Sequence, residues 1–352
     1  MSCRKGLLGA LVLASAFGPG CQGAQSGKDG DGTDTATGPA PDGGTDSEDA
    51  GDAGADAGEI TFDCSWCAHT GITPGAMLCA FEACDPDYAF DSFFISPTNT
   101  PIVGTHAAVK RFGVATNGLA PKGEDSYALL ATGPALGTSH SIDLGGIAGA
   151  DPYANDDYPA PIYNAMEWSI VLKAPKKARG FSFNYVFFSE EYDDFVGTSY
   201  NDKFYVFLES ESTNGGKKTI INFTSCRQPA LYNDFLCPSD ATYCEPKEPY
   251  CYIAINSAYS DCCWYNNCPN PQPKTDIAGT GFECAASSAD DGLAHGSSTG
   301  WLKTSWPIRP EEQFKLTFHV HDTNDGSYDS EVILDNFHFL SRKPDTGTVK
   351  PE

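Results

Sequence analysis

The sequence predicts an all-β protein, a β-sandwich or jelly-roll-like domain with a disulfide-rich insertion. Short runs alternate apolar and polar residues with the period of a half-buried strand, as in residues 314–320 (FKLTFHV). Clusters of Gly, Pro, Asn and Asp separate these runs, and no amphipathic pattern of a dozen residues indicates a helix. Short strands joined by frequent turns are typical of sandwiches rather than α/β folds.

The chain begins with the pattern of an export signal, residues 1–21. Arg4 and Lys5 precede an apolar run over residues 7–17, which is too short to cross a bilayer as a mature helix. The small residues before Cys21 resemble a bacterial lipobox, in which that cysteine is lipidated; ordinary signal cleavage nearby is the alternative. The sequence therefore predicts an exported lipoprotein anchored at the cell envelope or surface, or else a secreted protein.

Residues 22–58 are predicted to be a disordered acidic tether. The segment contains mainly Gly, Asp, Ala, Thr, Pro and Ser, with no aromatic or branched aliphatic residue. Such a composition cannot bury enough apolar surface to offset the entropy of ordering. The whole chain has a formal net charge of −25, which argues against binding to nucleic acid or to anionic lipid.

Fourteen cysteines are present, and an even number remains after Cys3 is removed with the signal and Cys21 is assigned to lipid. They form one group in a small segment, residues 59–84, and a second in an insertion, residues 226–284. Even groups on an exported chain favour disulfides of undetermined connectivity. A zinc knot is the alternative for the first group. The disulfide candidates are Cys64, Cys67, Cys79, Cys84, Cys226, Cys237, Cys244, Cys251, Cys262, Cys263, Cys268 and Cys284.

The predicted sandwich occupies residues 85–342 and is followed by a tail, residues 343–352. On one strand Trp168, Ile170 and Leu172 share a face, and on the next the aromatic residues of FSFNYVF alternate in the same way. The strands expected in chain order cover residues 126–132, 166–173, 181–187, 203–209, 219–224, 251–256, 314–320 and 332–334.

Two acidic loops contain candidate calcium ligands. One follows the strand at residues 314–320, and the other, residues 189–202, follows an aromatic strand. Carboxylates this close repel one another unless a cation or hydrogen-bond donors neutralise them, and Ca²⁺ prefers oxygen ligands. If both loops lie at one end of the sandwich, they assemble one calcium site; solvated acidic turns are the alternative. The candidate ligands are Glu191, Asp194, Asp202, Asp322, Asn324, Asp325, Asp329 and Asp335.

Two other patterns indicate different chemistry with less specificity. Glu190 or Glu191 has the residue type of one member of a glycosidase carboxylate pair. His319 and His321 share one face of a strand, and together with His338 they have the composition of a transition-metal site. Satisfied strand-face histidines and exposed acidic turns are the commoner uses of such residues.

Trp264 and Tyr265 are candidate ligand-binding residues because they lie in the cysteine-rich insertion, where a sugar could stack on an exposed ring. No G-x-S-x-G elbow, P-loop or H-E-x-x-H motif occurs. The sequence therefore predicts no catalytic residues.

Residues 183–210 (FNYVFFSEEYDDFVGTSYNDKFYVFLES) resemble a hallmark of the choice-of-anchor L domain family. Residues 279–284 (GTGFEC), 296–302 (GSSTGWL) and 321–339 follow in the order of that family, and residues 123–133 are similar to its early glycine-rich strand. The resemblance covers about residues 85–340 and implies a β-rich domain of a secreted or surface protein. It implies no catalytic residues, and this chain departs from the pattern in its cysteine-rich insertion and N-terminal lipid signal.

Together these patterns predict a non-catalytic binding or adhesion module at the cell surface or envelope, stabilised by Ca²⁺. The alternatives are an extracellular polysaccharide hydrolase that uses the acidic loops and a purely structural envelope protein. The expected partners are the membrane, through the lipid, and an extracellular ligand such as a glycan or matrix protein.

Overall fold

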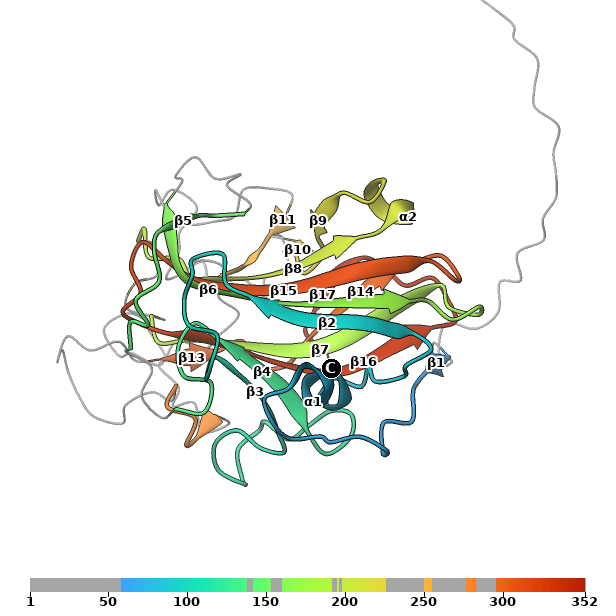
Figure 1. Cartoon of the computed structure of the whole chain (residues 1–352), viewed down its shortest axis with the longest axis horizontal. Helices are drawn as coiled ribbons and strands as arrows, with labels where there is room; N and C mark the ends of the chain where they lie inside the picture. Colours follow the sequence, from blue (N-terminus) through green and yellow to red (C-terminus); the bar gives the residue numbers. More distant parts are fainter. Residues whose placement is uncertain are drawn as a thin grey trace, which may run out of the picture. The chain divides into compact units, whose positions relative to one another are not determined.

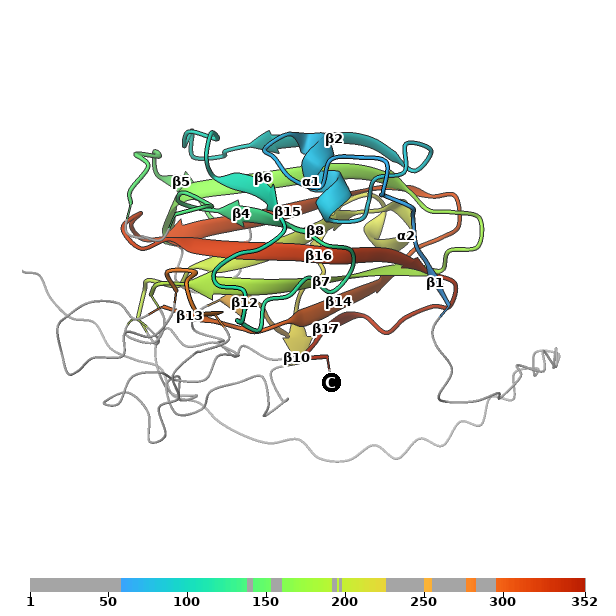
Figure 2. The same ribbon diagram turned by 90° about the horizontal axis from the view of Figure 1, so that it is seen from below.

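Two antiparallel β-sheets lie face to face and enclose the main core (Figure 1, Figure 2). The computed structural model describes residues 58–137, 142–152, 160–191, 195, 198–225, 250–254, 277–282 and 296–351. All of them belong to one unit, Gly54–Glu352. The predicted signal, Cys21 and nearly all of the tether lie outside the described residues, as do most of the insertion and both Trp264 and Tyr265.

The first sheet has the strand order β17-β14-β7-β16-β4-β3, with β1 paired to β16 and β13 paired to β7. Its strands are β1 (Glu59–Ile60), β3 (His106–Val109), β4 (Tyr127–Ala131), β7 (Gly180–Ser189), β13 (Ser297–Ser298), β14 (Leu302–Pro307), β16 (Ser330–Leu340) and β17 (Gly347–Val349).

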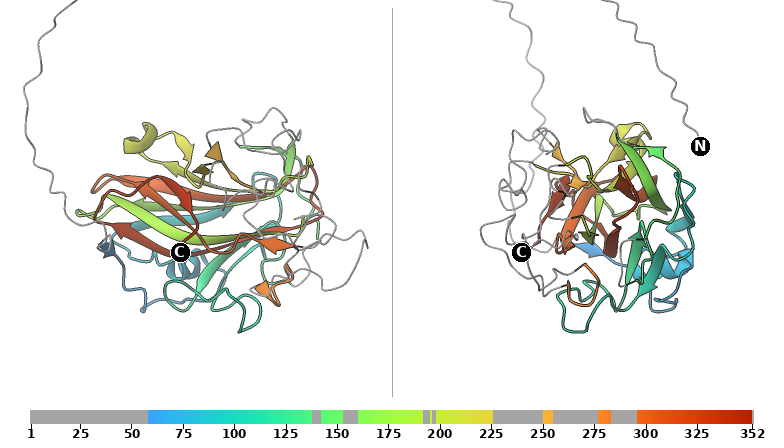
Figure 3. Two further views of the ribbon diagram at one scale, coloured as in Figure 1. Left: turned by 180° about the vertical axis from the view of Figure 1, so that it is seen from behind. Right: turned by 90° about the vertical axis from the view of Figure 1, so that its left-hand side faces the viewer.

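The second sheet has the order β12-β8-β15-β6-β2, with β5 paired to β6 and β9 paired to β8. Its strands are β2 (Ala89–Ile95), β5 (Gly149–Ala150), β6 (Pro161–Lys173), β8 (Lys203–Glu209), β9 (Lys218–Ile220), β12 (Ile253–Ala254) and β15 (Gln313–Thr323). A separate pair consists of β10 (Thr224–Ser225) and β11 (Tyr250–Cys251). Figure 3 shows the two layers from behind and from one end.

The alternation seen in the sequence matches the inner faces of the sheets. Trp168 on β6 lies opposite Phe318 on β15, and their stacked rings are 5.4 Å apart between centroids. On β16, Val332 and Leu334 belong to the core between the sheets, whereas Ile333 belongs to a second apolar cluster on the outer face. The all-β prediction is therefore confirmed, and Trp168 and Phe318 lie in the core, on the faces that the alternation predicts.

The N-terminal cysteine-rich segment is part of the sandwich rather than a separate unit. Its helix α1 (Pro74–Ala80) begins after Thr73, whose side chain accepts a hydrogen bond from the Ala76 amide, with Pro74 in the first turn. Phe81, directly after the helix, is fully buried and lies 5.1 Å from the Phe318 ring. The sequence-based boundary at residue 85 therefore does not separate two cores.

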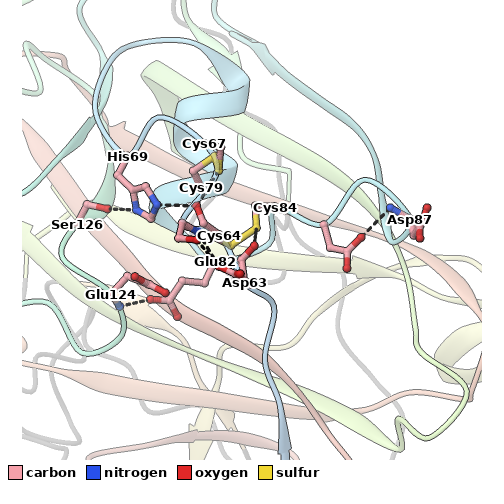
Figure 4. Close-up of a disulfide and its surroundings, with 12 residues drawn as sticks. Asp63, Cys64, Cys67, His69, Cys79, Glu82, Cys84, Asp87, Glu124 and Ser126 are labelled. Atoms are coloured by element: carbon pink, nitrogen blue, oxygen red, sulfur yellow. Dashed lines mark hydrogen bonds between the residues drawn. A yellow bond between two sulfur atoms is a disulfide. The ribbon is translucent and has the colours of Figure 1, made fainter.

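Two disulfides hold this segment, Cys64–Cys84 and Cys67–Cys79 (Figure 4). Cys251 lies in β11, and the remaining cysteines of the insertion lie outside the described residues. Near the first bridge, the His69 ring contacts the Cys64 carbonyl oxygen through Nε2 at 2.8 Å. Disulfides, rather than zinc, thus account for the first cysteine group.

Three smaller expectations need correction. The predicted tail contains a strand, β17, which pairs with β14 at the sheet edge. The run expected at residues 219–224 divides into β9 and β10, and the run at residues 251–256 divides between β11 and β12. Besides α1, the described chain has one more short helix, α2 (Glu211–Asn214). In this part of the chain no helix is long and apolar enough to cross a membrane.

Candidate functional site

Both acidic loops lie at the same end of the sandwich because four strands begin or end there. On the first sheet, Ser330 at the start of β16 pairs with Ser189 at the end of β7. On the second sheet, His321 near the end of β15 pairs with Lys203 at the start of β8. The two acidic loops are the connection between β15 and β16 and the connection between β7 and β8. They therefore leave the two sheets next to each other.

Four buried carboxylates from these loops form the candidate site, which we call the carboxylate cluster. They are Glu191, Asp202, Asp322 and Asp329, and each is at most 1% exposed. Repulsion between Asp202 and each of the other three contributes to their pKa values, which places the four groups within electrostatic reach of one another. The predicted convergence of the two loops is thus present in the structure.

Asp202 holds the two loops together. Its Oδ1 accepts a hydrogen bond from the Thr323 amide at 2.8 Å, and its Oδ2 accepts one from the Ser330 hydroxyl at 2.8 Å. The side chains of Glu191 and Asp202 also interact directly, which raises the pKa of Glu191 and opposes the rise at Asp202. Two carboxylates this close repel each other when both are charged, so their proximity favours a proton on one of them.

Other oxygens of the cluster have no hydrogen-bond partner. They are Oε2 of Glu191, Oδ1 of Asp322 and both carboxylate oxygens of Asp329. The described chain contributes no lysine or arginine that pairs with any of the four carboxylates. A buried, unpaired carboxylate is costly, so the cluster has to be neutralised by protons or by a cation.

Burial sets the protonation of the cluster, and mutual repulsion adds to it. Loss of hydration is the largest cause that raises the pKa of Glu191 and of Asp322 well above their ordinary values, and the charge of Asp202 follows. Burial likewise raises the pKa of Asp202 to about 7, against the Thr323 and Ser330 donors. The pKa of Asp329 rises to about 8; the Ile142 amide opposes this rise, although no hydrogen bond of regular geometry reaches either Asp329 oxygen.

Neighbours that the sequence did not indicate shape this end. A Cβ atom at Gly133 would lie 2.1 Å from Oδ2 of Asp329, so only glycine lets that turn approach the carboxylate. Asn164, fully buried on β6, donates from Nδ2 to Oδ2 of Asp322 at 3.1 Å and to the Gly326 carbonyl oxygen at 3.3 Å. These contacts join positions more than 150 residues apart, and no local pattern predicts them.

The other four predicted ligands are not members of the carboxylate cluster. Asp335 is separated from the cluster: its carboxylate accepts hydrogen bonds from the amides of Lys122 at 2.6 Å and Asn336 at 2.7 Å. Asn324 donates to the Ser199 hydroxyl at 2.8 Å. Asp325 is half-buried and accepts a hydrogen bond from the Ser327 amide in a local turn, but its charge still raises the pKa of Glu191 and of Asp202, so it lies at the edge of the cluster. Asp194 lies outside the described residues.

The cluster is not a preformed coordination sphere. Within the ranges that the structure describes, no three His, Cys, Asp or Glu side chains are positioned to hold a metal ion as they stand. A cation would have to draw the free oxygens of Glu191, Asp322 and Asp329 together.

The three histidines do not converge on one site. His319 and His321 contact each other on β15, with Nε2 of His319 2.9 Å from Nδ1 of His321, and Glu167 contacts Nδ1 of His319 at 3.0 Å. His338 lies on β16 in the other sheet, where its Nε2 is 2.8 Å from the Ser182 hydroxyl. The transition-metal interpretation of the three residues is therefore corrected.

A serine–histidine contact occurs near the first disulfide (Figure 4). Nδ1 of His69 lies 3.1 Å from the Ser126 hydroxyl, and the same nitrogen is 3.9 Å from Asp125. In a catalytic triad the acid contacts the opposite ring nitrogen, and the serine must be accessible. Ser126 is fully buried, so this contact is structural.

Comparison with known protein families matches residues 174–339 to the choice-of-anchor L domain. A search of the curated proteins finds no match. The family match begins later than the sequence resemblance at residue 85, but it contains β7, β8, β15 and all of β16 except its last residue, the strands around the carboxylate cluster. The family is one of surface-associated or secreted proteins. Residues 174–339 are thus a choice-of-anchor L domain, and the protein is a surface or secreted protein that carries it.

Proposed function

We propose that this chain is a non-catalytic binding or adhesion module of the cell surface, and that Ca²⁺ stabilises the end of the sandwich that holds the carboxylate cluster. The observation that carries the proposal is the set of unpartnered oxygens on Glu191, Asp322 and Asp329, all at most 1% exposed. Attachment to a membrane through lipid on Cys21 is part of the same proposal.

The chemistry of the cluster favours Ca²⁺ over other ions. Its groups are oxygens, which suits a hard cation, whereas zinc and copper favour nitrogen and sulfur. Ca²⁺ tolerates irregular geometry and accepts backbone carbonyl oxygens, so carboxylates contributed by two loops suit it better than Mg²⁺. Binding would replace the protons that burial keeps on these groups.

The burial of Glu191 supports a binding function rather than hydrolysis. A glycosidase acid has to reach the glycosidic oxygen of its substrate, and Glu191 is 1% exposed. Release of sugars from a polysaccharide that is lost in the Glu191→Gln variant would favour the hydrolase alternative.

The test is a thermal melt of the oxidised full chain, with Ca²⁺ and with EDTA. A ligand that binds only the folded state adds about 2.7 kcal/mol of stability at a hundredfold excess over its dissociation constant. The Asp322→Asn and Asp329→Asn variants should lose this difference. Asp335→Asn is the matched control, since Asp335 is also buried but lies outside the cluster, and it should keep the difference. Equal melts of the unmodified chain in Ca²⁺ and EDTA would overturn the proposal.

A further inference from the structure

The end of the sandwich opposite the carboxylate cluster gathers basic residues. Three segments meet there: the Arg179 amide donates to the Leu340 carbonyl oxygen at 2.6 Å, and the Ala174 amide donates to the Glu312 carbonyl oxygen at 2.9 Å. Seven of the chain's 22 Lys and Arg lie there, together with the acidic residues Glu59, Asp87, Glu311 and Glu312. The basic residues are Lys173, Lys176, Lys177, Arg179, Arg309, Arg342 and Lys343.

A cavity of about 630 Å³ opens at this basic end. Lys173, Lys176 and Lys177 line it, and Lys176 and Lys177 are exposed to solvent. None of the three amino groups forms an ion pair within the described chain, although Asp87 and Glu311 line the same cavity. Three lysines without acidic partners around one opening favour an anionic ligand.

Apolar and aromatic residues form another part of the cavity wall. Tyr88 stacks on Phe62 with ring centroids 5.3 Å apart and an interplanar angle of 19°. The Lys173 amide donates a hydrogen bond to the Tyr88 carbonyl oxygen at 2.7 Å, which holds the backbone of Tyr88 in place. Ile60 and Pro175 complete the apolar lining. An aromatic ring held in place beside polar groups is the surface on which a sugar ring stacks, while carboxylates accept hydrogen bonds from its hydroxyls.

We propose that this cavity binds an anionic sugar, a carboxylated or sulfated unit of an extracellular polysaccharide. The lysines contact the acidic substituent, Tyr88 contacts the ring, and Asp87 and Glu311 accept hydrogen bonds from hydroxyl groups. The volume lies in the range of about 300–1,000 Å³ that is typical of small-ligand sites. The cavity and the carboxylate cluster lie at opposite ends of β16, whose 11 residues span roughly 35 Å, so this site does not depend on Ca²⁺.

Calorimetric titration of the full chain tests the proposal, in buffer stripped of calcium with a chelating resin. The probes are trigalacturonate and a sulfated heparin tetrasaccharide, with neutral maltotriose and inorganic phosphate for comparison. At least one charged saccharide should bind, and the K173Q/K176Q/K177Q variant should weaken that binding by at least about tenfold. The matched control K217Q/K303Q/K350Q removes the same charge elsewhere and should stay within about twofold.

The Tyr88→Leu variant separates the ring contact from the charge contact. It should weaken the binding of the charged saccharide and leave the weak binding of phosphate unchanged. Equal affinity for maltotriose would overturn the proposal, as would phosphate that binds as tightly as the charged saccharides. Equal losses in the two triple variants, or no binding of either charged saccharide, would also overturn it.

Discussion

Removal of the two disulfides around α1 should destabilise the protein in a cooperative way. Cys64–Cys84 closes a loop with a sequence separation of 20, and Cys67–Cys79 closes one of 12 inside it. Replacing each pair by alanine removes one bridge without leaving a free thiol, and replacing all four cysteines removes both.

Because one loop lies inside the other, the stabilisation by each bridge depends on whether the other bridge is present. When the inner bridge is intact, it shortens the outer loop to about 9 residues, so the outer bridge contributes about 2.6 kcal/mol by loop-closure entropy. The inner bridge contributes about 2.1 kcal/mol when the outer one is present, so the two single-pair losses add up to about 4.7 kcal/mol. Loss of both bridges lowers the free energy of unfolding by about 5.4 kcal/mol, which is more than that sum. Cavities left by the buried Cys64, Cys79 and Cys84 add to each loss without changing the order of the variants.

Urea denaturation of the full chain, followed by tryptophan fluorescence, measures these free energies, provided that the slope of the transition is the same in all variants. The variant without both bridges should lose more stability than the two single-pair variants together. If it loses no more than the weaker single-pair variant, loop closure does not explain how these bridges stabilise the protein.

Three further substitutions test the core, the carboxylate cluster and the pH dependence of stability. Phe81→Ala should cost about 3–5 kcal/mol in urea denaturation because the ring is fully buried between both sheets; a loss below about 1 kcal/mol would contradict its central place. Gly133→Ala should cost about 1–3 kcal/mol and remove stabilisation by Ca²⁺, because the new Cβ would lie 2.1 Å from Asp329. Gly75→Ala, with no atom near its Cβ, should do neither. Burial is the largest cause that raises the pKa of Asp335, from 3.8 to about 7. Between about pH 4 and pH 7 the folded state therefore holds a proton that the unfolded state has released, and stability falls as pH rises. Asp335→Asn should remove up to about 4 kcal/mol of this fall, measured by urea denaturation at pH 4.5 and pH 7.5; an unchanged slope would contradict the assignment.

Local patterns in the sequence determine much of this fold. The alternation of Trp168, Ile170 and Leu172 places these residues in the core, because a strand turns every second side chain to the same face. The gathering of both acidic loops at one end follows from antiparallel pairing of the strands beside them. The helix α1 has only 7 residues, which is too short to produce a periodic signal of its own.

The sequence pattern predicted neither the distance of Asp335 from the cluster nor the contacts that Asn164 and Gly133 make across the fold. Asp335 lies on the same strand that begins beside the cluster, β16, but it is five residues beyond Ser330, at roughly 17 Å from the loop end. The alternation specifies the face of the sheet and gives no limit on this distance. Asn164 and Gly133 reach the cluster only through the packing of β6 and β4 against β15 and β16, which depends on the pairing of strands far apart in the chain.

The position of the first disulfide also determines how the domain responds to mechanical tension from its N-terminal side. Such a pull meets β1, whose two residues pair with Leu340 and Phe339, and then reaches Cys64. From there the bridge passes the force directly to Cys84, so the residues between them, including α1, carry none of it. Those residues would add about 70 Å if extended. A stretched domain therefore cannot release the residues between Cys64 and Cys84 until a reductant opens the bridge, and any further extension has to come from the chain beyond Cys84.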